Sequence, residues 1–310
     1  MPVRPLDLLD LPFIYKYRHQ VVPLDSARAL TQANLLEANA FFSNLKSDRE
    51  IATAISKQDG SALLGQVTHS KPSPYANLAF LAPPQRSDLD HAALLNYLAV
   101  QAGAWGCLYL LAEVDECSPI FKSLRQAGFS MYAWQRVWKL TGTGQPGGQD
   151  PWLETQELDL VAIQSLYSQI VPAMLQPVEP LPRQSSGLVC RQDGELKAYL
   201  SLTYGPSGIW VQPLIHPDAN CLPGWMNALL AAIPDRHNRP VYFCVRSYQA
   251  WLTSMLEELG ASAGERQAVM IRHLAVLKRV EETLAVKNVE PAWAKSATTV
   301  NRINPTDSES

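Results

Sequence analysis

The sequence predicts an α/β chain of two tandem domains, each a mixed sheet flanked by helices. Three observations indicate this class: an ordered repeat, a glycine-rich segment between the copies, and the same alternation of strand and helix patterns in both. The length of 310 residues is typical of about two domains. We expect domains at 1–140 and 151–280, a linker at 141–150 and a disordered tail at 281–310.

The repeat consists of blocks that match in the same order along both halves. Residues 10–14, 58–60 and 124–128 match residues 159–163, 192–194 and 256–260, at separations of 149, 134 and 132 positions. Gln135 and Val137 recur at the last separation, as Gln267 and Val269. Chance similarity among common residues is the alternative, but the preserved order favours duplication.

Helix caps, turn residues and apolar runs predict the elements of the first half. Asp10 is expected to cap a helix with Pro12 in its first turn, and Ser118 a later helix that Gly128 ends. The predicted elements are, in order, a strand at 3–8, the Asp10 helix, a helix at 26–45, a hairpin turning at 57–60, a strand at 76–82, a helix with Leu94, Leu95, Leu98 and Ala102 inward, a buried strand at 107–114, the Ser118 helix and a strand at 129–140.

The second half predicts the same order with fewer helices. Its elements are a strand at 153–158, a helix capped by Asp159, a hairpin turning at 191–194, a strand at 208–215 that leads into a helix, a strand at 241–245, a helix after Ser247 that buries Trp251, Leu252, Met255, Leu256 and Leu259 and stops at Gly260, and a strand at 265–277.

Charge and composition exclude several classes of function. Residues 1–140 carry 13 Lys and Arg against 12 Asp and Glu, and residues 151–280 carry 10 against 11. Neither half has the basic excess that nucleic acid demands, so neither nucleic acid nor a membrane surface is an expected partner. No apolar run approaches the ~18 residues of a membrane span, and the N-terminus does not read as a signal peptide.

Cysteine and histidine spacings indicate neither a metal site nor a disulfide framework. The five cysteines include no Cys-x-x-Cys pair, and the six histidines lack metal-ligand spacing. We therefore expect no metal and a reducing, cytoplasmic setting.

The order of elements resembles the GNAT superfamily of N-acetyltransferases, in two tandem copies. The stretches that carry the resemblance are Val3–Pro12 and Leu124–Phe129 followed by Tyr132, and it covers nearly all of both halves. It implies mixed, mostly antiparallel sheets and transfer of an acetyl group from acetyl-CoA to an amine of a small molecule or peptide. The first copy is the better candidate for this activity.

The resemblance also implies where acetyl-CoA would bind: between the splayed fourth and fifth strands, with its pyrophosphate on backbone amides at the start of the next helix. In the first copy these amides belong to Gln85, Arg86, Ser87, Asp88 and Leu89. The family's two glycine positions there hold Asp88 and Asp90, whose charges would repel a pyrophosphate. Alternatively, Ser87 or Asp88 only caps the helix.

Two further differences from the family pattern concern proton transfer. Leu124 and Leu256 stand where many members place a proton-donating tyrosine, and Cys117 and Gln249 stand where an asparagine often opens the same helix. The second copy, at 216–224, keeps one glycine and no basic residue. The alternative function is therefore a non-catalytic binding or scaffold protein that has lost acetyl-CoA binding.

Two groups of side chains are candidates for an acceptor site. Glu113 and Asp115, at the end of the buried strand, are weak candidates for activating an amine, or belong to a solvated loop before Ser118. Trp134 and Trp138 are expected to share a face with Tyr132, and to pack between the copies or line an acceptor groove. The oligomeric state is not predicted.

Overall fold

A computed structural model describes residues 3–32, 49–58, 61–84, 91–142, 151–181, 187–219 and 228–274. These residues belong to one compact unit, Met1–Val276. Most of the expected linker, from 143 to 150, and the expected tail at 281–310 lie outside the described residues.

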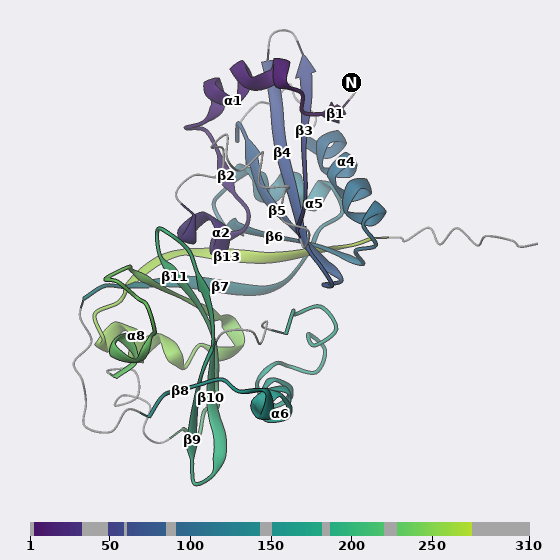
Figure 1. The fold of residues 1–310 in the computed structure, drawn as a ribbon. Helices are drawn as coiled ribbons and strands as arrows, with labels where there is room; N and C mark the ends of the chain where they lie inside the picture. Colours follow the sequence, from purple (N-terminus) through teal and green to yellow (C-terminus); the bar gives the residue numbers. More distant parts are fainter. Residues whose placement is uncertain are drawn as a thin grey trace, which may run out of the picture. The chain divides into compact units, whose positions relative to one another are not determined.

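The described elements follow the predicted order in both halves (Figure 1). The first half contains β1 (Val3–Pro5), the 3₁₀ turn η1 (Leu8–Asp10), α1 (Leu11–Tyr17), β2 (Val22–Pro23), α2 (Ser26–Thr31), β3 (Arg49–Gln58), β4 (Ser61–Ser70), β5 (Tyr75–Ala82), α4 (His91–Ala104), β6 (Tyr109–Asp115), α5 (Pro119–Gln126) and β7 (Ser130–Leu140). The second contains β8 (Leu153–Glu154), η3 (Glu157–Asp159), α6 (Leu160–Ile170), β9 (Gly187–Gln192), β10 (Glu195–Tyr204), β11 (Ile209–Ile215), β12 (Val241–Arg246), η4 (Ser247–Gln249), α8 (Leu252–Glu258) and β13 (Ser262–His273).

One mixed sheet runs through both halves in the order β1-β3-β4-β5-β6-β13-β7-β12-β11-β10-β9-β8, and β2 pairs with β5. Only β5–β6 and β11–β12 are parallel among the described pairs, which confirms the mixed, mostly antiparallel sheet. The last strand of each half lies next to strands of the other half, because β13 separates β6 from β7 and β7 separates β13 from β12. Figure 1 shows β13 and β7 side by side beneath β6.

The pairing of β7 with β13 relates the two halves by an approximate two-fold axis. Gln135 lies opposite Gln267, its own counterpart in the repeat, and Arg136 lies opposite Arg266. The Gln135 amide donates a 2.8 Å hydrogen bond to the Gln267 side-chain oxygen. A residue can pair antiparallel with its own counterpart only where a local two-fold axis passes between them, so the 132-position repeat is present in the packing as well as the sequence.

Asp10 and Asp159 occupy equivalent places, but the prediction that their side chains cap the helices is wrong. Neither carboxylate makes a cap hydrogen bond to its α-helix. Each instead closes the preceding 3₁₀ turn and pairs with a cation of the hairpin, Lys57 for Asp10 and Arg191 for Asp159, at 2.5 Å in both cases. The preceding 3₁₀ turn explains the difference, because it already brings the chain into helical conformation and leaves the carboxylates free for these cations.

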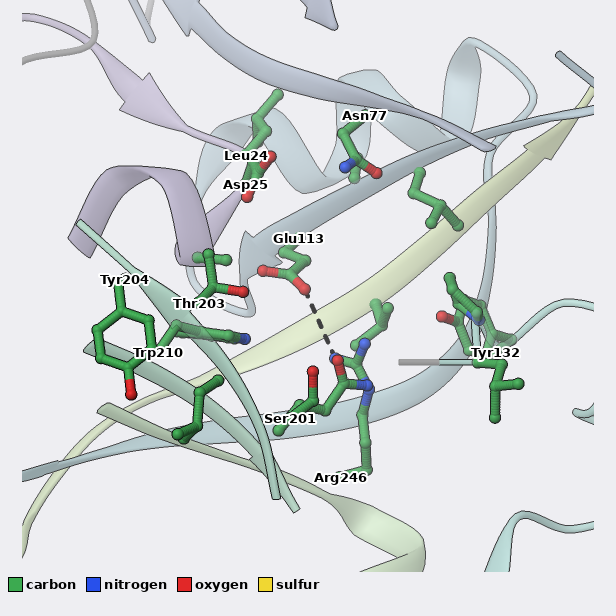
Figure 2. Close-up of a pocket in the computed structure, with 18 residues that line it drawn as sticks. Leu24, Asp25, Asn77, Glu113, Tyr132, Ser201, Thr203, Tyr204, Trp210 and Arg246 are labelled. Carbon is green, nitrogen blue, oxygen red and sulfur yellow. Dashed lines mark ion pairs between the residues drawn. The ribbon is translucent and has the colours of Figure 1, made fainter. Parts of the chain in front are cut away.

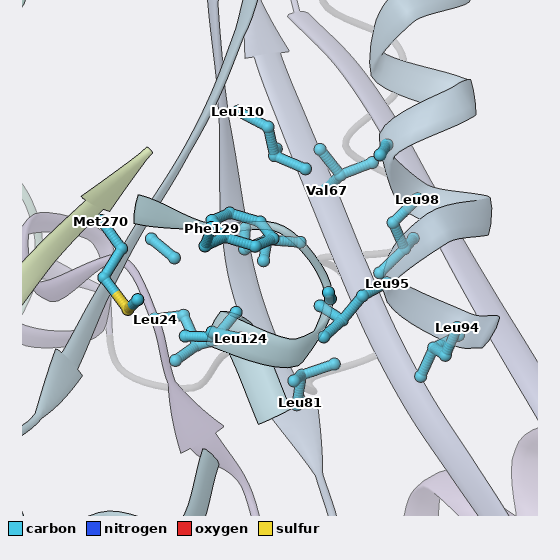
Figure 3. Packing of buried hydrophobic residues seen from close by; sticks show 14 of the residues in the cluster. Leu24, Val67, Leu81, Leu94, Leu95, Leu98, Leu110, Leu124, Phe129 and Met270 are labelled. Carbon is cyan, nitrogen blue, oxygen red and sulfur yellow. The ribbon is translucent and has the colours of Figure 1, made fainter. Parts of the chain in front are cut away.

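Each of the two main hydrophobic cores also contains a side chain from the last strand of the other half. The first core contains the four α4 residues predicted to face inward, together with Leu124 and Phe129, and Met270 of β13 packs among them (Figure 3). In the second core, Trp138 of β7 is only 2% exposed. Trp251 was expected to be buried there but is 38% exposed, because the helix begins one residue later, at Leu252.

Candidate binding cavity at the junction of the two halves

The predicted pyrophosphate-binding residues Gln85, Arg86, Ser87, Asp88 and Leu89 lie outside the described residues. Residues 220–227 of the second half do so too. The fit of acetyl-CoA can therefore be tested only at the strands between which its pantetheine arm would lie.

In the first half, the chain itself fills the space between the splayed strands. β5 and β6 pair only at Tyr75–Asn77 and Tyr109–Leu111, and then diverge. The Leu24 N–H donates to the Ala79 carbonyl (3.0 Å), and the Leu24 carbonyl accepts from the Glu113 N–H (2.8 Å). Because β2, directly before Leu24, pairs along the same edge of β5, backbone groups on both facing edges already have partners.

In the second half, one side chain closes the equivalent gap. β11 and β12 pair over Ile209–Val211 and Val241–Phe243 before they diverge. The buried Gln249 amide then donates to the Pro213 carbonyl (2.9 Å) and accepts from the Ile215 N–H (3.2 Å). Gln249, which stands where the family often has an asparagine, therefore connects the edge of β11 to η4 through these two hydrogen bonds.

The residues present do not fit acetyl-CoA at either gap. A pantetheine arm would have to displace the Leu24 backbone in the first half or the Gln249 side chain in the second. Leu124 and Leu256, at the family's tyrosine position, are both buried in hydrophobic cores and offer no proton.

A cavity of about 510 Å³ lies beside the first gap and is lined by both halves (Figure 2). Its lining includes Asp25, Glu113 and Tyr132 of the first half and Ser201, Trp210 and Arg246 of the second. Two carboxylates and one guanidinium therefore face a space with aromatic walls.

The charges on this cavity are fixed by contacts across the junction. The Glu113 carboxylate accepts from the Ser26 N–H at 2.9 Å and lies 3.6 Å from the Arg246 guanidinium. Arg246 also pairs at 3.2 Å with Glu179, which is 2% exposed. Burial disfavours the charge of Arg246, but Glu179 and the weaker effects of its other neighbours, Glu113 included, together outweigh burial and raise the pKa of Arg246 above its usual value.

Asp25 supplies the second carboxylate and begins α2. Its Oδ1 accepts from the Arg28 N–H at 3.0 Å, which makes it the N-cap. Burial and the neighbouring Glu113 charge raise the pKa of Asp25 to about 6. An ammonium group between the two carboxylates would relieve this repulsion.

The structure separates the two predicted catalytic candidates. Glu113 faces the cavity, whereas Asp115 is exposed and accepts a hydrogen bond from the Gln267 amide (2.9 Å). The adjacent Glu116 forms a two-pronged ion pair with Arg266 at 2.6 and 2.8 Å. A catalytic role for either candidate stays a prediction.

A β-bulge separates Tyr132 from the tryptophans with which it was expected to share a face. Val269 pairs with Ala133 and Met270 with Met131, so Tyr132 is the extra residue. It lines the cavity, while Trp134 packs against the first core and Trp138 enters the second.

Sequence reasoning missed Asp25 and Arg246. Asp25 precedes an expected helix, as any capping aspartate does, and Arg246 directly follows the apolar run of β12. A charged residue at the end of a buried strand is a usable signal, and it indicates Arg246 in the second half as it indicates Glu113 and Asp115 in the first.

Neither a metal centre nor a membrane-crossing helix is present in the described ranges. No group of three or more His, Cys, Asp or Glu side chains there is placed to hold a metal ion. The helices described are too short or too polar to cross a bilayer.

Comparison with known proteins supports the fold. No family model and no curated protein matches the sequence. The GCN5-related N-acetyltransferase from Sphaerobacter thermophilus aligns with a TM-score of 0.53 at 13% identity, over 88% of this chain and 95% of its own. A tandem GNAT protein from the clavulanic acid biosynthesis pathway aligns at 0.50 and 14%, over 88% of this chain and 98% of its own. At such identities the likeness establishes the fold alone, and the chain has the tandem fold of the GNAT superfamily.

Proposed function

We propose that this chain is a GNAT-fold binding protein that has lost acetyl-CoA-dependent transfer. The observation that carries the proposal is that its own residues fill both inter-strand gaps, by the Leu24 backbone and the Gln249 side chain. Without a place for the pantetheine arm, the protein keeps only the cavity of about 510 Å³, which would hold the amine acceptor.

The ligand class follows from the charges at the cavity. Asp25 and Glu113 are both acidic, and Arg246 is shared with the buried Glu179. Trp210 and Tyr204 add aromatic walls, which favour cations. A small cationic amine satisfies both features.

Calorimetric titration tests the loss of acetyl-CoA binding. We expect neither acetyl-CoA nor CoA to release heat or raise the melting temperature at millimolar concentration. Saturable one-to-one binding of either compound would overturn the proposal.

Amine binding is tested by titrating benzylamine or putrescine into the wild type and into Glu113→Gln. The variant removes the charge but keeps an acceptor for the Ser26 N–H, so we expect affinity to fall about tenfold or more. Glu116→Gln is the matched control, because Glu116 is exposed and does not line the cavity. Equal affinities for the two variants would contradict the assignment.

A second candidate is an N-acetyltransferase in the first half, with a small-molecule or peptide amine as acceptor. The observation that favours it is Glu113, a carboxylate beside the inter-strand gap that faces the cavity. Mass spectrometry of the acetylated amine is the suitable readout, since the exposed Cys117 would react with a thiol reagent. Product that disappears in Glu113→Gln would establish this activity, and no product above background would exclude it.

A further inference from the structure

We propose that a second cavity, beside the first, binds an anionic group between Arg28 and Arg49. This cavity measures about 580 Å³ and is lined by Arg28, Arg49, Thr68, Tyr75 and Asn77, among others. Its chemistry suits a carboxylate, a phosphate or a sulfate, and it does not depend on the amine site.

The first observation is an unsatisfied buried cation. Arg28 is only 8% exposed. Its Nε donates to the Gln32 side-chain oxygen at 3.2 Å, but its Nη1 is buried and has no hydrogen-bond partner among the residues that the structure describes. A buried donor of a charged group is costly to leave unpaired, so this atom indicates a missing acceptor.

The second observation is a neighbouring like charge. Arg49 begins β3 and lines the same cavity. Burial lowers the pKa of Arg28, the Asp25 carboxylate partly opposes this shift, and the charge of Arg49 adds to it. Within the ranges described above, no ion pair joins either guanidinium to a carboxylate.

Polar side chains complete a site of the right chemistry. Thr68 and Asn77 add a hydroxyl and an amide to the lining, next to two guanidinium groups whose planar forks match the oxygens of a carboxylate or phosphate. Asp25 is the one acid among the described residues that line this cavity, and its Oδ1 accepts a hydrogen bond from the Arg28 N–H. The lining therefore favours an anion over a cation.

The sequence places this cavity and the predicted pyrophosphate-binding residues at different ends of β5. The cavity adjoins Tyr75, where β5 begins, whereas Gln85–Leu89 follow the opposite end of that strand. The linings of the two cavities overlap, with Asp25, Asn77 and Thr203 among the shared residues, so one molecule with an ammonium and an anionic group could span both. That extension rests on the proposed function, whereas the anion site stands without it.

The experiment titrates sodium phosphate and, separately, sodium acetate against the full chain, with chloride keeping the ionic strength constant. Melting temperature and calorimetric heat are the readouts, and no amine is present, so failure of the amine proposal leaves the result unaffected. We expect saturable binding of at least one anion in the millimolar range. Whichever of the two titrations saturates, phosphate or acetate, identifies the class of anion that the site binds.

Variants locate the site. Arg49→Gln changes an exposed residue and should weaken binding about tenfold, as should Arg28→Gln. Arg125→Gln, which removes an exposed guanidinium from α5, should leave affinity unchanged. The proposal is overturned if neither anion saturates beyond the effect of chloride, or if Arg49→Gln binds as tightly as Arg125→Gln.

Discussion

Replacing Arg246 by methionine should strongly destabilise the protein, because it leaves two carboxylates without their shared cation. Arg246 is 6% exposed and lies 3.2 Å from Glu179 and 3.6 Å from Glu113. Breaking a buried pair by removing one partner typically costs ~3–5 kcal/mol. At ~2 °C per kcal/mol for a chain of this size, the melting temperature should fall by about 6–10 °C.

The same reasoning predicts a rescue. The triple variant Arg246→Met, Glu113→Gln, Glu179→Gln removes the guanidinium and both carboxylates that it pairs with, so most of the lost stability should return in urea unfolding. Arg266→Met is the control, because its pair with Glu116 is exposed and should contribute at most ~1 kcal/mol. A triple variant no more stable than the single one, or a single variant as mild as the control, would refute the reasoning.

Three further substitutions probe the fold. Trp138→Ala should cost ~3–5 kcal/mol in urea unfolding, since Trp138 fills the second core, and a loss below 1 kcal/mol would contradict that role. Two partly exposed cations hold the pKa of Asp10 at about 2 against burial, below its usual 3.8, so its stabilisation of ~1 kcal/mol is present above pH 4 and is lost as the pH falls towards 2. Wild type and Asp10→Asn should therefore converge in stability at low pH, and a constant gap would exclude this linkage. Gln249→Leu leaves the Ile215 N–H and the Pro213 carbonyl unpaired and should cost ~1–3 kcal/mol; no loss would show that Gln249 does not close the gap.

Features with local causes were predictable from the sequence. Gly128 and Gly260 end their helices with φ of +83° and +72°, a conformation that glycine adopts without penalty. Ser118 caps α5 through its hydroxyl, and the 191–194 hairpin turns through residues of positive φ at Asp193 and Gly194. Each of these depends on a few neighbouring residues, so the pattern alone suffices.

The exchange of last strands was not predictable in this way. The continuous apolar run at 268–271 indicates a buried strand but does not identify the strands beside it, because both faces and both edges of a buried strand look alike in sequence. The sequence also gives no sign that the Leu24 backbone connects β5 to β6, because β2, directly before it, has only two residues and shows no periodicity. For the candidate site, the sequence indicated Glu113 but not its partner Arg246, which is remote in the chain.

The two-fold axis gives a physical reason to assign different roles to the halves. The scaffold obeys the symmetry, because Gln135 faces Gln267 and each last strand borders the other half. The charges do not. At the separation of 132 positions, Glu113 corresponds to Val245 and Arg246 corresponds to Val114, so the acid and its cation each have an apolar counterpart. A symmetric pair of sites would place two such clusters about the axis, whereas these residues place one. The duplication therefore supplied a shared sheet in which the first half contributes the cavity's carboxylates and the second contributes the guanidinium that holds Glu113.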